Sequence, residues 1–324
     1  MGIVRKIKRS EERVEDITIQ EAFDEYINEK IAKNLSDSSI KNYKKTFKVF
    51  MDFYEYGGDA PLNTITQSDM YEWMGTMKLE GLKVTSINSY MTNIKAFLRW
   101  AMEEDKGYLK PFKFPKMRGQ EEPLKLFSED DIQILLEKPK NPNDFTENRS
   151  WAIVNWVLAT GNRAATICEV RISDIDFKTK EITLRHTKNK KAQIIPLSPS
   201  LEAVVKKFIK EWRGDAKDGW LFPNIGDEQL TTTALAKSFR KYCTNRGVNQ
   251  YNIHGLRHNF AKYWVLNNGN IFALQKVLGH STLEMTRRYV KLFGDDIKTD
   301  YEKFSALDTL KRNSKRTQTV RRGV

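Results

Sequence analysis

A mainly helical chain with one small antiparallel sheet in the second of two domains is the fold class that the sequence predicts. Apolar residues recur at helical spacing along most of the chain, and a pair of strand-like segments interrupts them between residues 181 and 197. The length of 324 residues suits two domains better than one. Hydrophobic residues make up 40% of the chain, which allows a core in each domain and excludes a disordered protein.

The composition favours an acidic partner inside the cell. Lys and Arg number 55 against 42 Asp and Glu, a net charge of +13 that suits nucleic acid, although such a surplus also serves solubility. The apolar runs are far shorter than the roughly 20 residues of a membrane helix, and the opening MGIVRKIKRS has no signal-peptide core. Two cysteines, Cys168 and Cys243, exclude a disulfide scaffold. We therefore expect a cytoplasmic, nucleoid-associated protein with no membrane partner.

Residues 17–105 predict a helical DNA-binding domain. Thr18 with Glu21, and Thr66 with Asp69, have the spacing of capping boxes at helix starts. The helix between these two caps carries four lysines at helical spacing, which repel each other unless an anion lies alongside, although any one of them also suits a solvated face. The lysines predicted to contact DNA are Lys41, Lys44, Lys45 and Lys48.

Two basic segments flank this domain. Residues 1–16 predict a flexible basic arm, and residues 106–126 predict a basic linker whose prolines disfavour helix and stiffen the chain. A semi-rigid basic connector suits a protein that wraps around a duplex. The linker residues predicted to contact DNA are Lys113, Lys116 and Arg118.

Residues 127–295 predict the second, larger domain. Ser128 and Asp131 have capping-box spacing, and a helix over residues 151–159 ends near Gly161. Further helices are expected over residues 232–245, 255–267, 271–278, 282–293 and, beyond this domain, 296–311.

A β-hairpin is predicted within the second domain. Residues 181–184 and 193–197 have strand-like alternation, and the segment between them has turn character. That turn carries Lys188 and Lys190.

Two histidines have the spacing of a metal-binding pair. His254 and His258 lie four residues apart in a predicted helix, and His280 is a candidate third ligand for zinc. Arg257 stands beside the pair, and a fixed cation disfavours a bound metal ion. We therefore expect no metal and no cofactor.

One set of motifs carries the most chemical information. In chain order they are TGNR at 160–163, TKNKK at 187–191, HGLRH at 254–258, LGH at 278–280 and RY at 288–289. This order and spacing resemble the catalytic domain of the tyrosine recombinases, the phage-integrase family, and residues 17–105 are similar to its helical, SAM-like domain in architecture. The resemblance implies a two-domain C-shaped DNA clamp and a C-terminal exchange helix within residues 296–324, followed by a basic tail.

The chemistry of DNA cleavage that the resemblance implies explains why that motif set holds these residue types without a metal. Negative charge builds on the phosphoryl oxygens, and arginine offers a permanent charge with a fixed fork of donors. Arg163 and Arg257 are therefore expected to clamp the non-bridging oxygens, with His280 as a further donor. The resemblance implies that Tyr289 is the nucleophile and forms a 3′-phosphotyrosyl link; Tyr263 and Tyr301 are the alternatives.

Two further residues are expected to move protons. Surrounding cations are expected to lower the pKa of Tyr289, and His254 is the expected base. Lys188 is the expected acid that protonates the leaving 5′ oxygen, in preference to Lys190, which is expected to contact DNA. His258 is expected to serve the structure of its own helix.

The chain departs from the family pattern at two positions. Thr166 stands where members often carry an acidic residue, and Asn162 stands where an apolar residue is usual. Both departures concern the support of Arg163 and leave the expected catalytic groups in place.

The expected function is a site-specific DNA recombinase or integrase that acts on double-stranded DNA as a homotetramer, through a Holliday junction. Integration and excision of a mobile element is the favoured role, with resolution of chromosome dimers as the other, and an accessory DNA-bending factor is a candidate partner. The amphipathic segment 296–310 is expected to dock on a neighbouring protomer, although it also suits its own domain. The alternatives are a type IB-like topoisomerase and a non-catalytic DNA-binding regulator.

Overall fold

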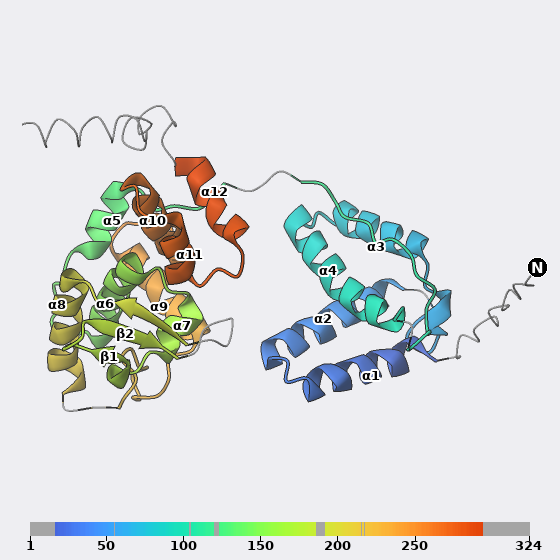
Figure 1. Cartoon of the computed structure of the whole chain (residues 1–324), viewed down its shortest axis with the longest axis horizontal. Coiled ribbons are helices and arrows are strands. Elements are labelled where there is room, and N and C mark those ends of the chain that lie inside the picture. The colour runs from blue at the N-terminus through green and yellow to red at the C-terminus, as the bar shows by residue number, and fades with distance from the viewer. Residues whose placement is uncertain are drawn as a thin grey trace, which may run out of the picture. The chain divides into compact units, whose positions relative to one another are not determined.

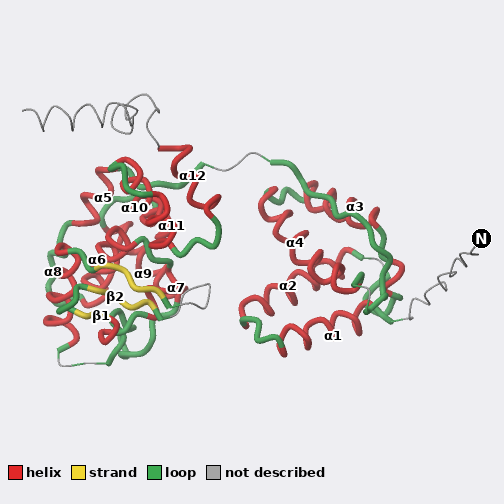
Figure 2. Tube along the Cα trace, viewed as in Figure 1, coloured by secondary structure: helices red, strands yellow, loops and turns green. Residues whose placement is uncertain are grey.

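The computed structural model describes residues 17–54, 56–103, 105–119, 123–185, 192–214, 216 and 218–293. The expected basic arm, the hairpin turn with Lys188 and Lys190, and the expected exchange helix and tail lie outside these residues. Chain contacts divide the protein into two compact units, Met1–Glu122 and Pro123–Val324. Both are built mainly of helices, and the second contains a small antiparallel sheet, which confirms the predicted fold class (Figures 1 and 2). Among the described helices, none is long and apolar enough to cross a membrane.

The helices of the first unit begin where local capping signals stand. The Thr18 side chain accepts a hydrogen bond from the Glu21 amide, and the Glu21 carboxylate accepts one from the Thr18 amide. Thr66 and Asp69 form the same box, so both predicted helix starts are confirmed. The α-helices are α1 (Ile19–Ala32), α2 (Asp37–Phe53), α3 (Gln67–Leu79) and α4 (Val84–Ala101), with a 3-10 turn at Leu62–Thr64.

Aromatic side chains form the centre of the first unit. Phe23 of α1 stacks on Phe47 of α2 with ring centroids 3.7 Å apart, and Phe97 of α4 meets Phe23 edge to face. Trp100 is buried, and its indole N–H donates to Glu29 at 2.6 Å. The three helices are therefore joined by apolar contacts that burial makes favourable.

Much of the predicted linker packs on the first unit. Leu109 is buried in that unit's core, and Met117 exchanges two hydrogen bonds with Asn88 of α4, at 2.9 and 3.1 Å. Figure 2 shows this loop segment running along the unit. Phe112 and Phe114 also lie against this core, so the predicted linker is packed on the first unit as far as Met117. Residues 120–122 are not described, and residues from 123 onward belong to the second unit.

The second unit combines helices with a three-stranded antiparallel sheet in the order β1-β2-β3. Ile182 of β2 pairs with Ile195 of β3, and both side chains are buried. The predicted strands are confirmed as β2 and β3. The elements are α5 (Glu129–Leu136), α6 (Phe145–Thr160), α7 (Ala164–Glu169), β1 (Ile175–Asp176), β2 (Glu181–Leu184), β3 (Gln193–Pro196), α8 (Pro199–Phe208), a π-helical turn (Ile209–Arg213), α9 (Thr232–Asn245), α10 (Ile253–Leu266), α11 (Ile271–Leu278) and α12 (Leu283–Phe293), with a 3-10 turn at Ile172–Asp174.

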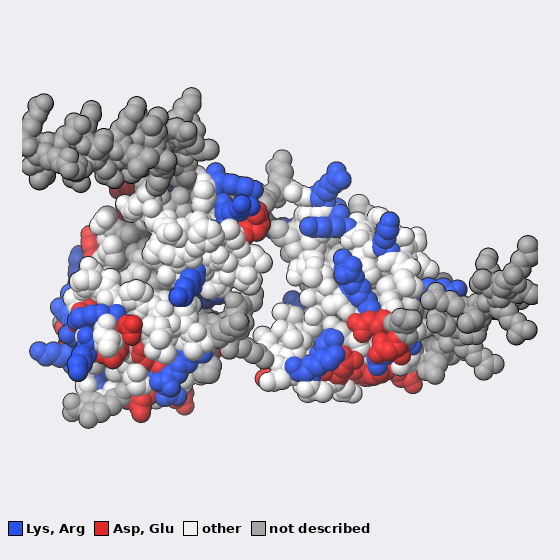
Figure 3. Space-filling model, viewed as in Figure 1, with Lys and Arg blue, Asp and Glu red and all other residues white. Residues whose placement is uncertain are grey.

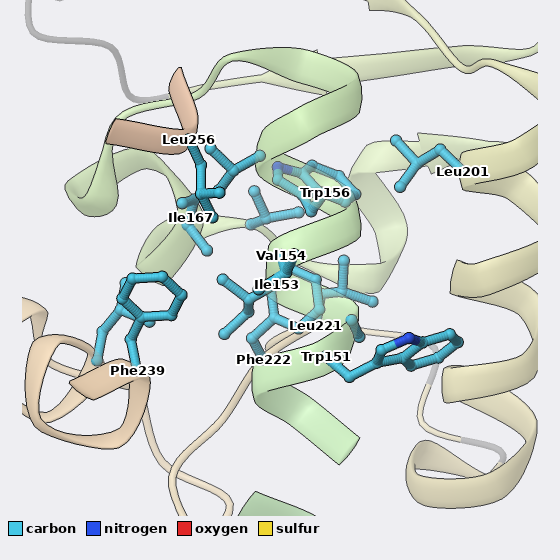
Figure 4. Close-up of a cluster of buried hydrophobic side chains, with 14 of the residues drawn as sticks. Trp151, Ile153, Val154, Trp156, Ile167, Leu201, Leu221, Phe222, Phe239 and Leu256 are labelled. Carbon is cyan, nitrogen blue, oxygen red and sulfur yellow. The ribbon is translucent and has the colours of Figure 1, made fainter. Parts of the chain in front are cut away.

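Helix α6 is the centre of the second unit's core. Figure 4 shows Ile153, Val154 and Trp156 of α6 among buried side chains of neighbouring elements. Trp156 is fully buried, and its indole N–H donates to the side chain of Asn162 at 2.9 Å. A helix that is apolar on most sides must be surrounded by other elements. The end of α6 is therefore held firmly, and it leads directly into the site described next.

Candidate active site

Arg163 is positioned by the sharp turn that ends α6. Gly161 caps that helix with φ at +63°, and a Cβ there would lie 2.5 Å from Cδ1 of Phe260. Both the left-handed conformation and the close approach of Phe260 require glycine. The chain then reverses, and Arg163 stands at the start of α7.

Arg257 is the most buried cation of the site. It lies on α10, is 4% exposed, and donates to the carbonyl oxygens of Gly161 at 2.7 Å and Leu278 at 2.9 Å. Burial and the charge of Arg163 lower its pKa to about 10, so it stays protonated at neutral pH. Its fork of donors is thus held in place by backbone oxygens.

The C-terminal end of α11 holds both arginines. The Arg163 guanidinium donates to the same Leu278 carbonyl at 3.3 Å and to the Gly279 carbonyl at 3.4 Å. Carbonyl groups at a helix C-terminus carry partial negative charge, which offsets the repulsion between two neighbouring guanidinium groups. The long Arg163 bonds are weaker than those of Arg257 and are the easier ones to exchange for another acceptor.

His280 follows directly after that helix end, and both its ring nitrogens have partners. Nε2 lies 2.9 Å from Nη2 of Arg257, and Nδ1 lies 2.8 Å from the hydroxyl of Thr286. Because arginine only donates, Nε2 is the acceptor and Nδ1 carries the proton. Burial and the charges of Arg257 and Arg163 lower the pKa of His280 to about 4, which keeps the ring neutral.

Tyr289 of α12 is buried against this cluster. It is 4% exposed, and its hydroxyl lies 2.8 Å from Nδ1 of His258 on α10. Burial raises the pKa of Tyr289, although Arg257, Arg288 and Arg163 act in the opposite direction. The cations thus act on this pKa in the expected direction, but desolvation of the phenolate outweighs them and the net shift is upward.

The histidines of α10 differ from their expected places. The sequence assigned His258 to its own helix and His254 to the tyrosine, yet the observed hydrogen bond joins His258 to Tyr289. The ring of His254 lies 6.1 Å from that of His258, and its pKa is lowered by burial and by Arg257 and Arg163. The sequence signal that could have placed His258 in the site was its four-residue spacing from His254, which had suggested a metal pair. That spacing puts both rings on one side of α10.

One cavity of about 280 Å³ brings these residues together. Of the residues that the structure describes, no Asp or Glu lines the cavity, and no group of His, Cys, Asp and Glu among them could hold a metal ion. A basic, partly enclosed cavity suits an anion such as a phosphate. Five of the six expected catalytic residues line it: Arg163, His254, Arg257, His280 and Tyr289.

The sixth expected catalytic residue, Lys188, lies outside the described residues. The strand that follows it in the chain is nevertheless fixed to the site. Gln193, at the start of β3, donates to the backbone carbonyls of Lys276 at 2.6 Å and Val277 at 3.0 Å, in the last turn of α11. The base of the hairpin is thus tied to the helix whose end holds the two arginines.

The two departures from the family pattern are accommodated by packing. Asn162 accepts the indole hydrogen bond of Trp156 and is 5% exposed, so its polar amide is satisfied in the core. Thr166 is likewise buried, on α7. Neither position removes a group from the cavity.

The residues predicted to contact DNA are exposed where they are described. The exposed residues are Lys41, Lys44, Lys45 and Lys48 of α2, and Lys113, Lys116 and Arg118 of the segment after α4. Figure 3 shows acidic side chains of the first unit gathered near α1, with Lys and Arg spread over other parts of the drawn face. Lys190 lies outside the described residues, and DNA contact by all eight remains a prediction.

Comparison with known proteins gives the family. The model described as "Phage integrase family" matches residues 125–294, more than half of the chain, and "Phage integrase, N-terminal SAM-like domain" matches residues 21–105. Tyrosine recombinase XerA of Saccharolobus solfataricus is 26% identical over 87% of this chain and 91% of its own length. Tyrosine recombinase XerD of Staphylococcus haemolyticus is 26% identical over 89% of this chain and 98% of its own length.

Solved structures share the fold. The Tn1549 transposon integrase in complex with a circular intermediate DNA has a TM-score of 0.69 at 20% identity, covering 84% of this chain and 95% of that one. A lambda integrase tetramer bound to a Holliday junction has a TM-score of 0.68 at 18% identity, covering 87% and 78%. These likenesses show the fold, and the family model that matches more than half of the chain, with the relatives above, establishes that the chain belongs to the phage integrase family and is a tyrosine recombinase.

Proposed function

We propose that this tyrosine recombinase cuts and rejoins DNA strands at a specific site through Tyr289, and that it integrates and excises a mobile element. The observation that carries the mechanism is the cavity in which Tyr289 meets Arg163, Arg257 and His280. These residues come from α12, the start of α7, α10 and the end of α11, so only the folded unit assembles them.

The two arginines are the proposed phosphate ligands. A scissile phosphate entering the cavity offers charged oxygens in place of the Leu278 and Gly279 carbonyls that Arg163 and Arg257 now contact. Donors already aimed at a developing oxyanion contribute about 3 kcal/mol each to the transition state. His280 joins them as a donor once Arg257 turns to the phosphate and the ring proton moves to Nε2, with Nδ1 then accepting from the Thr286 hydroxyl.

Covalent chemistry then needs neither metal nor ATP. The Tyr289 oxygen attacks phosphorus, the bond from phosphorus to the 5′ oxygen breaks, and the 3′-phosphotyrosyl link keeps the bond energy for religation. Lys188 is the proposed acid that gives a proton to the leaving 5′ oxygen. His254 remains a proposed catalytic group at the wall of the cavity, where it can contact the bound phosphate.

Assembly on DNA belongs to the same proposal. We infer that the two units hold a duplex between them, using the exposed lysines of α2 and the basic segment after α4, and that four protomers exchange strands with residues 296–310 docked on a neighbour. The lambda integrase tetramer on a Holliday junction supports this assembly by likeness of fold. An accessory DNA-bending factor and action in the cytoplasm at the nucleoid complete the proposal.

The biological role has two candidates. The likeness to the Tn1549 transposon integrase favours a mobile element. The relatives named XerA and XerD, which match along nearly their whole lengths, favour a Xer-type role in resolving chromosome dimers.

Covalent trapping tests the proposed function. The wild-type protein is mixed with DNA that flanks its gene, denatured, and the protein-linked DNA is sequenced, with Tyr289→Phe as the matched control. We expect an adduct at one or two defined sequences that the variant lacks. Adducts without sequence preference would favour a topoisomerase, and tight binding with no adduct would favour a regulator.

A further inference from the structure

The hydroxyl of Tyr289 already has a basic partner in the protein. Its oxygen lies 2.8 Å from Nδ1 of His258, and the two ring centroids are 5.8 Å apart. The residues come from α12 and α10, which pack together, so the contact is built by the fold and not by neighbouring positions in the sequence. The pairing places a potential proton acceptor on the atom that attacks DNA.

The other two histidines of the cavity are less suited to take that proton. His280 lies parallel to the Tyr289 ring, but Arg257 occupies its Nε2 and Thr286 its Nδ1. His254 is one helical turn from His258, with ring centroids 6.1 Å apart. Among the hydrogen bonds of the described residues, the Tyr289 hydroxyl shares one with Nδ1 of His258.

The direction of this hydrogen bond follows from the charges around it. Burial, together with His254, Arg257 and Arg288, lowers the pKa of His258 to about 4, whereas burial raises that of Tyr289. At neutral pH the imidazole is therefore neutral and the phenol keeps its proton. Tyr289 donates, Nδ1 of His258 accepts, and the imidazole proton sits on Nε2.

We propose that His258 is a catalytic residue that accepts the phenolic proton of Tyr289 while the tyrosine oxygen attacks phosphorus. The inference rests on the proposed function and adds the group that activates its nucleophile. As the O–H bond breaks, the proton goes to Nδ1, the oxygen's electron pair forms the bond to phosphorus, and the 5′ oxygen departs with a proton from Lys188. In religation the imidazolium returns the proton to the tyrosine oxygen.

Proton transfer becomes favourable only when DNA is present. The charged and titratable groups that surround His258 are Arg257 and His254 of α10, Arg288 of α12, and, across the cavity, Arg163 and His280. The cations among them oppose a second positive charge on the imidazole. A bound phosphate balances them, and the negative charge that develops on its oxygens attracts the forming imidazolium. The nucleophile thus stays protonated until its substrate arrives.

Two variants of His258 separate proton transfer from packing. His258→Asn keeps an acceptor near the tyrosine hydroxyl but cannot take its proton, and His258→Ala opens space that added imidazole can fill. His254→Asn, one turn away, is the comparison variant that shows to which histidine the acidic limb belongs; its own rate is expected to fall, because His254 also lines the cavity. Each is measured in single-turnover cleavage of a nicked suicide duplex that carries the trapped site, alongside DNA affinity at equal salt.

We expect His258→Asn to slow cleavage by about a hundredfold or more while DNA affinity changes less than about twofold, because general-base help typically contributes this much. The wild-type rate should fall as the pH drops through the pKa of His258 in the DNA complex, and this acidic limb should be absent from His258→Asn. Imidazole should restore part of the rate of His258→Ala and leave Tyr289→Phe inactive.

A change of leaving group distinguishes the proposed role of His258, as the base for Tyr289, from that of Lys188, as the acid for the 5′ oxygen. Sulfur in place of the 5′ oxygen leaves without a proton, so it should rescue a Lys188→Ala variant and leave the His258→Asn defect unchanged. Cleavage by His258→Asn within threefold of wild type, or an acidic limb lost in His254→Asn instead, would overturn the assignment while the Tyr289 adduct still supports the proposed function. Absence of a Tyr289-dependent adduct in the wild type would overturn both.

Discussion

The second unit, or catalytic unit, has two hydrophobic clusters among its described residues, and they differ in size and in the side chains that they contain. The larger surrounds α6 and is made of side chains packed on every side of Trp156. In the smaller cluster the buried residues are Phe260, Ala261, Leu274, Leu278 and Tyr289. Tyr289, the proposed nucleophile, is thus a packing residue of the small cluster, and Arg257 beside it is held by hydrogen bonds to backbone carbonyls. Packing fixes the scaffold, whereas the groups proposed to bind phosphate have hydrogen-bond partners that an anion can replace.

The large cluster should be the more sensitive to loss of a side chain. Trp156→Ala removes a fully buried ring and leaves the Asn162 side chain without its indole donor. We expect the free energy of unfolding of the catalytic unit to fall by about 3–5 kcal/mol. Urea unfolding of the DNA-free protein, followed by circular dichroism, measures the change. Phe272→Ala on α11, which is 64% exposed, is the control and should change stability by less than about 0.5 kcal/mol.

If Trp156→Ala lowered the free energy of unfolding by less than about 1 kcal/mol, the large cluster would not be the part whose packing fixes the scaffold.

The small cluster should be the more sensitive in catalysis. Arg257→Lys keeps the positive charge but loses the fork that reaches Gly161, Leu278 and His280 together. We expect cleavage to slow by about 10²- to 10³-fold, the loss typical of one preorganised donor. The covalent adduct formed in a single turnover measures it. Arg287→Lys, whose side chain is 63% exposed on α12, should cleave like the wild type; equal rates for both variants would contradict the role given to Arg257.

A smaller effect on cleavage should come from the hydrogen bonds that join β3 to α11, the helix that contributes Leu274 and Leu278 to the small cluster. Gln193→Leu removes both hydrogen bonds to the last turn of α11 while keeping a side chain of similar size. Because β3 continues the chain from Lys188, we expect cleavage to slow about tenfold through poorer placement of the proposed acid. The neighbouring exposed residue gives the control, Ile194→Thr. A 5′-sulfur leaving group should remove the Gln193→Leu defect, and a defect that persists with sulfur would place the effect on the arginines instead.

Local signals explain which parts of the fold the sequence predicts. The capping boxes at Thr18, Thr66 and Ser128 are confirmed because each depends on residues three positions apart. Helix α8 carried a similar signal, Ser198 followed by Pro199 at the first helical position, and was overlooked. The six-residue helix α7 begins without a side-chain cap. Its packing against neighbouring elements holds it in place, and the local sequence does not show that packing.

The same distinction applies to the site, where motif spacing predicts some contacts and the packing of helices decides the others. The motif spacing predicted that Arg163, Arg257, His280 and Tyr289 would meet, and they do. It could not predict the partner of the Tyr289 hydroxyl, because that depends on how α10 and α12 face each other. The direction of the Tyr289 pKa shift also depends on burial, which charge counting along the chain does not give.

The smallest expected effects come from α2, whose exposed lysines contrast with the buried and half-buried cations of the cavity. Lys41, Lys44, Lys45 and Lys48 are exposed, so replacing one with Ala should alter stability by less than about 0.5 kcal/mol. If a lysine neutralises one phosphate, its loss lowers the salt dependence of DNA affinity by about one unit of slope. Lys33→Ala is the control, because Glu29 already balances that charge. Unlike a cavity variant, Lys45→Ala should cleave bound DNA at the wild-type rate; an unchanged slope in all four variants would assign these lysines to solvent.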